Sequence, residues 1–201
     1  MLLKCSLSGD ALTVQQNWTA SYNESNIESL SEKDNYILVS NAKGNFLTFS
    51  KTDISSPSSD VTFVNEPGHE KWGKSFVLLN NQVFWANWGA GLANLDLTNP
   101  ASPTVSTVIT HSKFKTQFPD SEGTMVYDVA YNSTKNLICV ANGWSGVFLV
   151  GPDNPDVILD YIDPKDVQNA SVATSGKYIF TGNISGGISG NLKGIMIYMV
   201  N

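Results

Sequence analysis

Residues 91–103 read GLANLDLTNPASP, and residues 104–110 read TVSTVIT. Apolar and polar side chains alternate over 92–97, which is typical of a half-buried strand. The Thr-Asn-Pro sequence at 98–100 then interrupts the alternation, because these residue types favour turns. The alternation returns after Pro103. The stretch therefore predicts two short strands joined by a proline-containing turn.

The same arrangement recurs along the chain. Four predicted strands, NYILVSN, VFWAN, NLICVAN and KYIFTGN, each end on a small residue followed by asparagine. A short loop follows each of them and leads to a glycine that opens another apolar strand, at Gly44, Gly91, Gly146 and Gly194. A weaker strand pattern precedes each asparagine-ended strand, and a fourth strand follows the turn in the first three units. Each complete unit therefore contains four short strands in about 50 residues.

Four strands per repeat with this period are typical of a β-propeller, in which each repeat forms one blade. A two-sheet sandwich is the main alternative, but it does not require Asn and Gly to recur in register. We therefore expect an all-β fold with a single domain over 1–201, made of a partial blade at 1–20, blades at 21–66, 67–112 and 113–165, and a partial blade at 166–201. The N-terminal segment contributes two strands and the C-terminal segment contributes three. Together with the three complete blades, they give one strand more than a closed ring of about four blades needs. Either one terminal strand is surplus, or the chain is an arc of a larger propeller.

The second unit resembles the LVIVD-repeat propellers. The match runs through Ala86-Asn87, Gly91-Leu92, Asp96, Thr98-Asn99-Pro100 and Pro103. The third unit matches more loosely and lacks the aspartate of the strand, and the first and fourth units are degenerate. The resemblance implies a propeller fold but no particular activity, because the family is defined by its architecture.

Composition restricts the classes of partner. The formal charge of −6 and the scattered Lys and Arg argue against nucleic acid, whose binding depends on clustered positive charge. No apolar run approaches the roughly 20 residues that span a bilayer, and the start of the chain lacks the apolar stretch of a signal peptide. We therefore expect either a cytoplasmic protein or a mature or excised piece of a longer one. Cys5 and Cys139 are predicted to be free thiols, and no motif calls for a cofactor.

Two loops after the recurring asparagines carry tryptophan. An indole beside an amide is a suitable pair for binding sugars, since the ring packs on C–H groups and the amide offers a donor and an acceptor. The candidate ligand-binding residues are Asn87, Trp88, Asn142 and Trp144. The alternative is structural: the Trp side chains fill gaps between blades, and the Asn side chains bond the backbone of their own turns.

The two longest predicted loops, 66–74 and 111–123, contain both histidines of the chain. A His and a carboxylate suit a metal or an acid–base site, and the candidates are His69, His111, Glu66, Glu70, Asp120 and Glu122. Nothing fixes them at ligand spacing, and the His-Glu pair in GHEKW lacks the second His of the zinc protease motif. We expect solvated loops, no catalytic residue and no metal.

Five Asn-x-Ser/Thr sequences are glycosylation candidates, at Asn17, Asn23, Asn132, Asn169 and Asn183. They favour an extracellular or cell-surface protein. The sequence as a whole predicts a non-enzymatic propeller that acts as a protein-interaction or self-assembly platform. A carbohydrate-binding propeller is the alternative, and a propeller hydrolase or lyase with a site near the two histidines is the third hypothesis.

Overall fold

The computed structural model describes residues 1–19, 26–163, 167–186 and 194–200. These residues form seventeen strands and one helix. The strands make five antiparallel sheets of two, four, four, four and three strands, and each sheet contains strands that follow one another in the sequence. The four-stranded unit expected from the repeat is therefore confirmed.

In chain order the sheets are an N-terminal hairpin, three complete blades and a last blade of three strands. The hairpin contains β1 (Leu2–Ser8) and β2 (Ala11–Trp18). The first blade contains β3 (Ile27–Lys33), β4 (Tyr36–Asn41), β5 (Asn45–Ser50) and β6 (Ser59–Thr62), and the second contains β7 (Phe76–Leu79), β8 (Gln82–Ala86), β9 (Leu92–Asp96) and β10 (Thr104–Ile109). The third contains β11 (Asp128–Asn132), β12 (Leu137–Ala141), β13 (Val147–Gly151) and β14 (Asn154–Ile162), and the last contains β15 (Val167–Ser175), β16 (Tyr178–Gly186) and β17 (Gly194–Met199).

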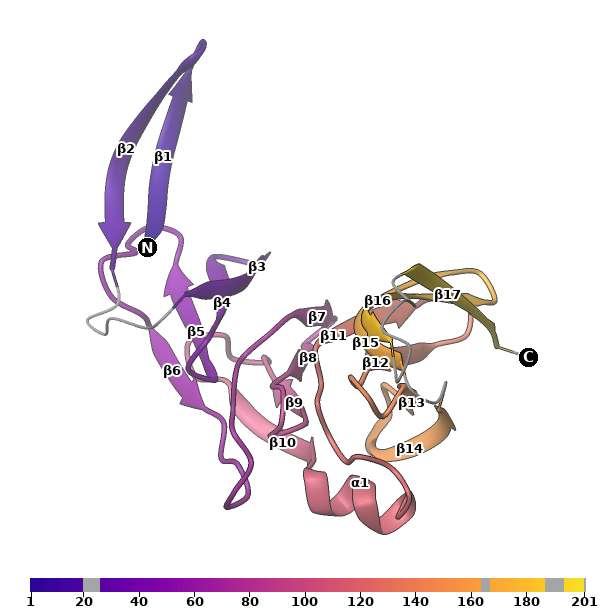
Figure 1. Ribbon diagram of the computed structural model, residues 1–201. Coiled ribbons are helices and arrows are strands. Elements are labelled where there is room, and N and C mark those ends of the chain that lie inside the picture. The colour runs from indigo at the N-terminus through magenta and orange to yellow at the C-terminus, as the bar shows by residue number, and fades with distance from the viewer. Residues whose placement is uncertain (20–25, 164–166, 187–193, 201) are drawn as a thin grey trace.

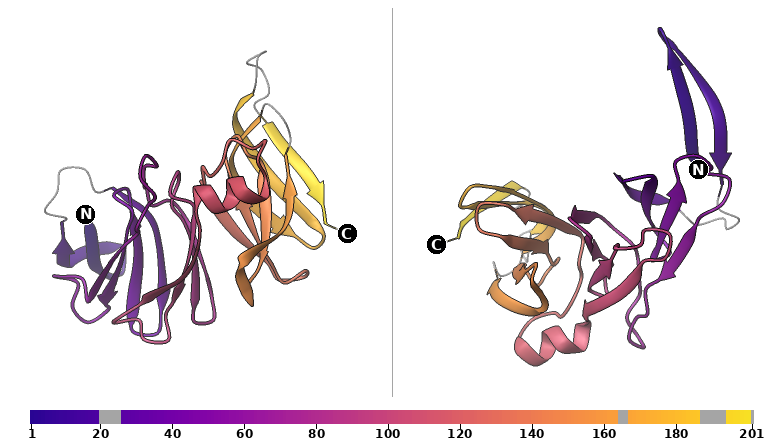
Figure 2. Two further views of the ribbon diagram at one scale, coloured as in Figure 1. Left: turned by 90° about the horizontal axis from the view of Figure 1, so that it is seen from below. Right: turned by 180° about the vertical axis from the view of Figure 1, so that it is seen from behind.

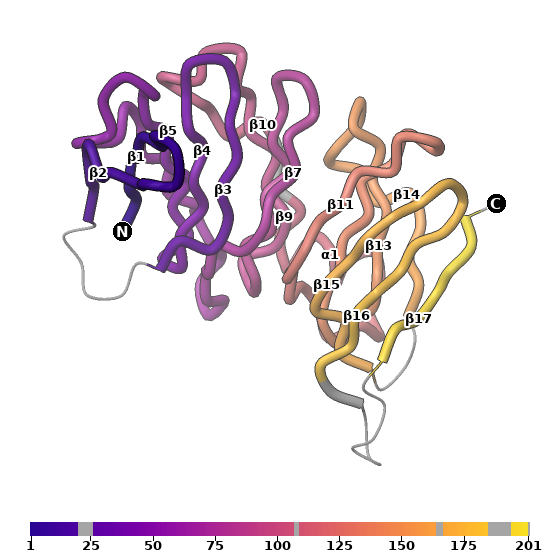
Figure 3. The backbone as a smooth tube through the Cα atoms, turned by 90° about the horizontal axis from the view of Figure 1, so that it is seen from above, coloured from indigo at the N-terminus to yellow at the C-terminus, as the bar shows by residue number. Residues whose placement is uncertain are grey.

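The sheets follow one another around an arc (Figure 1). On its inner side the first strand of the third blade, β11, contacts the first strands of both neighbours, β7 and β15, and on its outer side the fourth strands β10 and β14 contact each other. The hairpin and β17 lie at opposite ends of the arc in every view (Figures 2 and 3). The described residues therefore form an arc of a propeller and not a closed four-bladed ring.

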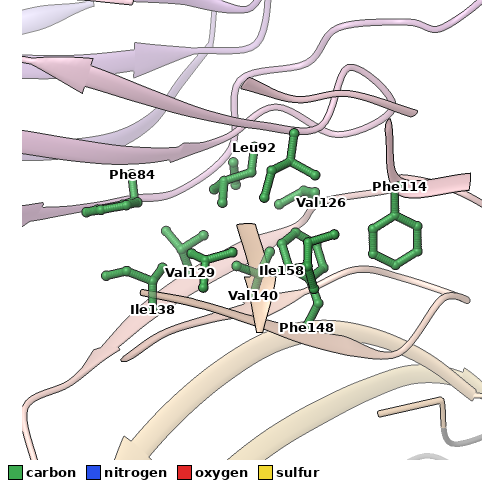
Figure 4. Close-up of a cluster of buried hydrophobic side chains, with 12 residues drawn as sticks. Phe84, Leu92, Phe114, Val126, Val129, Ile138, Val140, Phe148 and Ile158 are labelled. Carbon is green, nitrogen blue, oxygen red and sulfur yellow. The ribbon is translucent and has the colours of Figure 1, made fainter. Parts of the chain in front are cut away.

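Neighbouring blades pack face to face through buried apolar side chains. The largest cluster lies between the second and third blades and includes Phe84, Val140 and Phe148 (Figure 4). Equivalent clusters surround Trp85 between the first two blades and Leu149 between the third and last blades. Because each blade buries its apolar faces against its neighbours, blade stability depends on the neighbouring blade.

The turn in GLANLDLTNPASP is built by the side chains that define it. Asp96 Oδ1 accepts a hydrogen bond from the backbone N–H of Thr98 at 2.7 Å, and Asn99 Oδ1 accepts one from the N–H of Ala101 at 3.2 Å. Leu97 between them is fully buried. These bonds reverse the chain from β9 to β10, so the stretch is a structural element of the blade.

Polar bonds tie the inner edges of the blades together. Asp128 Oδ2 in the third blade accepts a hydrogen bond at 2.9 Å from the N–H of Val172 in the last blade, and its Oδ1 accepts one from the hydroxyl of Ser75 before the second blade's first strand. Trp85 Nε1 in the second blade donates to Ser40 Oγ in the first at 2.8 Å. Each complete blade is therefore bonded to the next through side chains as well as apolar packing.

The helix α1 (His111–Gln117) lies in a segment predicted to be a solvated loop, and that prediction is wrong for these residues. Thr110 caps the helix, because its side chain accepts a hydrogen bond from the N–H of Lys113. Phe114 is fully buried and belongs to the core between the second and third blades. The helix therefore seals the outer side of that core.

Candidate functional site

The loops of interest gather at one end of the blades. Antiparallel strands reverse direction at each turn, so the loop between the second and third strands lies at the same end as the connection that enters the next blade. We call this end the loop face, and it comprises loops 41–45, 87–91 and 142–146 together with connections 63–75 and 110–127. Backbone hydrogen bonds of 2.9 Å in both directions join Trp88 of one loop to Val126 of the next connection.

The two candidate asparagines are buried beneath this face. Asn142 Oδ1 accepts from the N–H of Met125 at 2.7 Å, and its Nδ2 donates to the carbonyl of Gly123 at 3.0 Å. Asn87 is fully buried as well, although its amide has no hydrogen-bond partner among the described residues. Asn142 thus fixes the connection into its own blade, and neither side chain reaches a ligand in solvent.

Trp88 and Trp144 are both half-buried on the loop face. Trp88 adopts a left-handed backbone conformation, with φ of 42°, and its ring meets the edge of Trp72 with 6.2 Å between centroids. Within the described residues no ring contact joins Trp144 to Trp88. The structure therefore places both predicted tryptophans on one face but does not combine them, or their asparagines, into one sugar site.

The most exposed tryptophan of the loop face is Trp72, with 40% of its surface accessible. Its Nε1 donates to Glu28 Oε1 at 3.2 Å, and Lys74 Nζ lies 3.9 Å from the centre of its ring. Lys74 also forms an ion pair with Glu28 at 3.9 Å. We call Glu28, Trp72, Lys74 and Trp88 the Trp72 cluster. Sequence reasoning missed Glu28 because it belongs to another blade than Trp72, and it missed Lys74, which shares the loop of Trp72, because no motif marks it.

The structure brings the two histidines together. His69 and His111 stack with 3.8 Å between ring centroids and 21° between ring planes. Nearby, Glu66 Oε2 accepts from both the N–H and the hydroxyl of Ser112, at 2.9 Å each. No group of three His, Cys, Asp or Glu in the described part of the chain is placed to hold a metal ion. The pair therefore joins two connections of the loop face.

The pKa values of His111 and Glu66 follow from their surroundings. Burial, together with the neighbouring His69, lowers the pKa of His111, while Glu66 acts in the opposite direction. Burial would raise the pKa of Glu66, but hydrogen bonds from Thr110 and Ser112 outweigh it and hold that pKa below its usual value. The arrangement favours a neutral His111 beside an ionised Glu66.

The glycosylation candidates differ in exposure. Asn17 on β2 is exposed, and Asn183 on β16 is half-buried. Asn132 and Asn169 are buried, and Asn132 Nδ2 donates to the carbonyl of Gly176, so neither side chain projects into solvent in this structure. Asn23 lies outside the described residues.

Other candidate features give little chemistry. Cys5 and Cys139 are free, as predicted, and burial raises the pKa of the Cys139 thiol to about 12, which makes it unreactive. A shallow cavity of about 220 Å³ lies away from the loop face, near the strand turns at 79–82 and 152–153, and Asn and Asp side chains line much of it. The helix of the described residues, α1, is too short to cross a bilayer.

Comparisons with solved structures identify the fold. The chain is similar to the β-propeller domain of Cps50 (Swd1) from Myceliophteria thermophila, with a TM-score of 0.68 and 6% identity over 98% of this chain and 63% of that one. It is also similar to two computationally designed proteins. For Ika4 the TM-score is 0.64 and the identity is 9%, over 93% of this chain and 99% of that one. For Ika8 the TM-score is 0.63 and the identity is 10%, over 94% of this chain and 50% of that one.

The chain thus spans about half the length of Ika8 and less than two thirds of the Cps50 propeller. No protein-family model and no curated protein sequence matches it. The predicted all-β propeller fold is confirmed.

Proposed function

We propose that the chain is a non-enzymatic propeller module that binds a protein partner through the Trp72 cluster on its loop face. The main support is the exposed indole of Trp72, which contacts the indole of Trp88 and the ion pair between Lys74 and Glu28. These side chains come from two blades. Tryptophan is strongly enriched at the residues that dominate the energy of protein interfaces. An exposed ring on a preorganised support loses little conformational entropy on binding, which favours affinity.

The shape of the face supports a macromolecular partner. Small substrates bind in enclosed pockets that bury most of their surface. The Trp72 cluster is instead an open surface, and the 220 Å³ cavity lies at other turns of the blades. The stacked histidines of the hydrolase hypothesis face each other, so each ring occupies the space that a substrate would need.

The proposal extends to family and location. The turn bonds of Asp96 and Asn99 give a structural reason for the LVIVD-type repeat pattern, which supports membership of that repeat family. The exposed Asn17 sequon on β2 supports an extracellular or cell-surface location, since a glycan at that position projects into solvent.

Selection of displayed peptides on the folded protein tests the partner class. We expect peptides selected on the wild-type chain to lose at least ten-fold in affinity for Trp72→Ala. The matched control is Trp144→Ala, which removes a half-buried tryptophan from the loop 142–146 of the same face and is expected to keep the affinity. Equal binding to all three proteins contradicts the proposed site.

The same variants address the carbohydrate alternative. The proposal predicts no binding of the wild-type chain to an array of glycans. Binding that disappears in a Trp88→Ala, Trp144→Ala double variant but persists in Trp72→Ala would replace the protein-interaction proposal with a carbohydrate-binding one.

A further inference from the structure

The last blade has one uncovered apolar face. Side chains alternate between the two faces of a strand, so Ile195, Ile197 and Met199 of β17 share a face, and Ile195 is 74% exposed. The pairing of β16 with β17 places Phe180 opposite Ile197 and Tyr178 opposite Met199. The other face of this sheet packs on the third blade. We call these five residues the end face.

The N-terminal hairpin carries a second uncovered apolar face at the opposite end of the arc. Leu7 pairs directly with Leu12, and Cys5 pairs with Val14, so these four side chains share one face of the ribbon. Leu7 is 71% exposed and Leu12 is 69% exposed. The opposite face presents small side chains such as Ser8 and Ala11. We call the apolar side the ribbon face.

The base of the hairpin is anchored while its tip projects. Leu2 is buried in a cluster with side chains of the first blade, and Trp18 meets Phe49 edge-on with 5.0 Å between ring centroids. Beyond this base the two strands extend away from the arc (Figures 1 and 2). A two-stranded ribbon is at best marginally stable alone in water, so a projecting ribbon with an apolar face gains stability from a covering surface.

We infer that a second copy of this chain covers both surfaces, with the ribbon face of each copy packed on the end face of the other. The blades already associate in this way, because each blade–blade cluster joins two apolar sheet faces. The uncovered end face is the next surface in that series. The hairpin cannot reach the end face of its own chain, since the two lie at opposite ends of the arc.

Two is the smallest number of copies in which both the ribbon face and the end face of every chain are covered. A contact between unlike surfaces closes into a ring only when the rotation per copy divides the full turn. The pairing uses neither Trp72 nor Trp88, so it stands or fails independently of the proposed partner site.

Light scattering after size-exclusion chromatography tests the pairing on the full 201-residue chain. We expect a mass twice the 21.8 kDa of one chain, constant over a ten-fold range of concentration. A single-chain mass, or a mass that rises steadily with concentration as in an open filament, overturns the inference.

Matched variants test the surfaces. Leu7→Lys with Leu12→Glu keeps an oppositely charged cross-strand pair but removes the apolar ribbon face, and we expect the mass to halve. Ser8→Lys with Ala11→Glu places the same charges on the opposite side of the ribbon and is expected to leave the dimer intact. The reverse pattern, or no difference between the two, overturns the assignment of the ribbon face.

A mixing experiment distinguishes unlike surfaces from a self-complementary one. Ile195→Lys with Ile197→Lys is expected to give a monomer, because it disables the end face. In a mixture of the two variants, the end-face variant still has an intact ribbon face and the ribbon-face variant still has an intact end face. The two monomers are therefore expected to form a heterodimer. Failure of the mixture to associate overturns the head-to-tail arrangement, and circular dichroism of each variant confirms that its sheets are folded.

Discussion

The imidazole ring of His69 stacks on that of His111 across two separate connections of the loop face, with 3.8 Å between ring centroids. His111 Nδ1 accepts a hydrogen bond from the N–H of Thr124 at 3.2 Å, which requires that nitrogen to be unprotonated. Gly123, with φ of +87°, lets the ring lie against its backbone, where a Cβ would overlap it. The contact between these two connections thus depends on a neutral His111.

The first prediction is a loss of stability at mildly acidic pH. The pKa of His111 is lowered in the folded protein by burial and by His69. The imidazole of the unfolded protein, with a pKa of about 6.5, therefore binds a proton at a higher pH than that of the folded protein. The free energy of unfolding decreases as the pH falls from about this value to the lower pKa of the folded protein. Urea unfolding between pH 7.5 and 5.5 measures this decrease. In His111→Gln the contribution of this group disappears, and an unchanged pH dependence contradicts the assignment.

The second prediction concerns Gly91, the glycine that opens β9. Its φ of +105° disfavours any other residue, and an added Cβ would overlap the carbonyl oxygen of Ile109. Gly91→Ala is expected to destabilise the protein by about 2 kcal/mol or more. Gly194→Ala is the matched control, because Gly194 begins the corresponding strand of the last blade and a Cβ added there would have no atom within 4 Å. Comparable losses in chemical denaturation of the two variants would contradict the turn geometry.

The third prediction concerns the bond between the first two blades. Ser40→Ala leaves the buried Trp85 N–H without its acceptor, so a loss of about 1–3 kcal/mol is expected. The exposed Ser133 provides the control, and its replacement by Ala is expected to have little effect. A double-mutant cycle with Trp85→Phe is expected to give a coupling of about 1 kcal/mol. Additive effects in that cycle mean that the bond does not link the blades.

The fourth prediction tests the inner-edge tie at Asp128. Asp128→Ala leaves the N–H of Val172 unpaired and is expected to cost about 2 kcal/mol. Asp128→Asn retains one acceptor oxygen and one donor, which suit Val172 and Ser75 respectively, so its loss is expected to be smaller. Hydrogen exchange at Val172 reports the bond directly: faster exchange in the Ala variant than in the Asn variant is expected, and identical rates contradict the tie.

The fold was predictable because its information is local and repeated. The strand-end Asn, the following Gly and the proline turn recur in register, and each has a backbone role that the structure displays at Asn142, Gly91 and Asn99. The helix α1 also left a local signal that was overlooked: Thr110 as a cap, followed by Phe114 and Phe118 one helical turn apart.

The candidate site was only partly predictable. Trp88 was placed correctly on a loop between strands, and the loops of the two histidines were recognised. The partners Glu28 and Trp72 lie in different blades, and the stacking of His69 on His111 depends on how two connections pack. Such contacts depend on the rotation between blades, which no single repeat encodes. The burial of Asn87 and Asn142 was not predictable, because an Asn that bonds its own turn and an Asn that binds a ligand look alike in sequence.

Hydrogen–deuterium exchange of the chain with its tightest selected peptide tests the central claim most directly, because it locates the partner on the surface without a mutation. The account predicts slower exchange in the connection at 66–74 and in the loop at 87–91, which hold Trp72 and Trp88. Protection confined to the strand turns at 79–82 and 152–153, at the polar cavity, would contradict a partner site on the loop face.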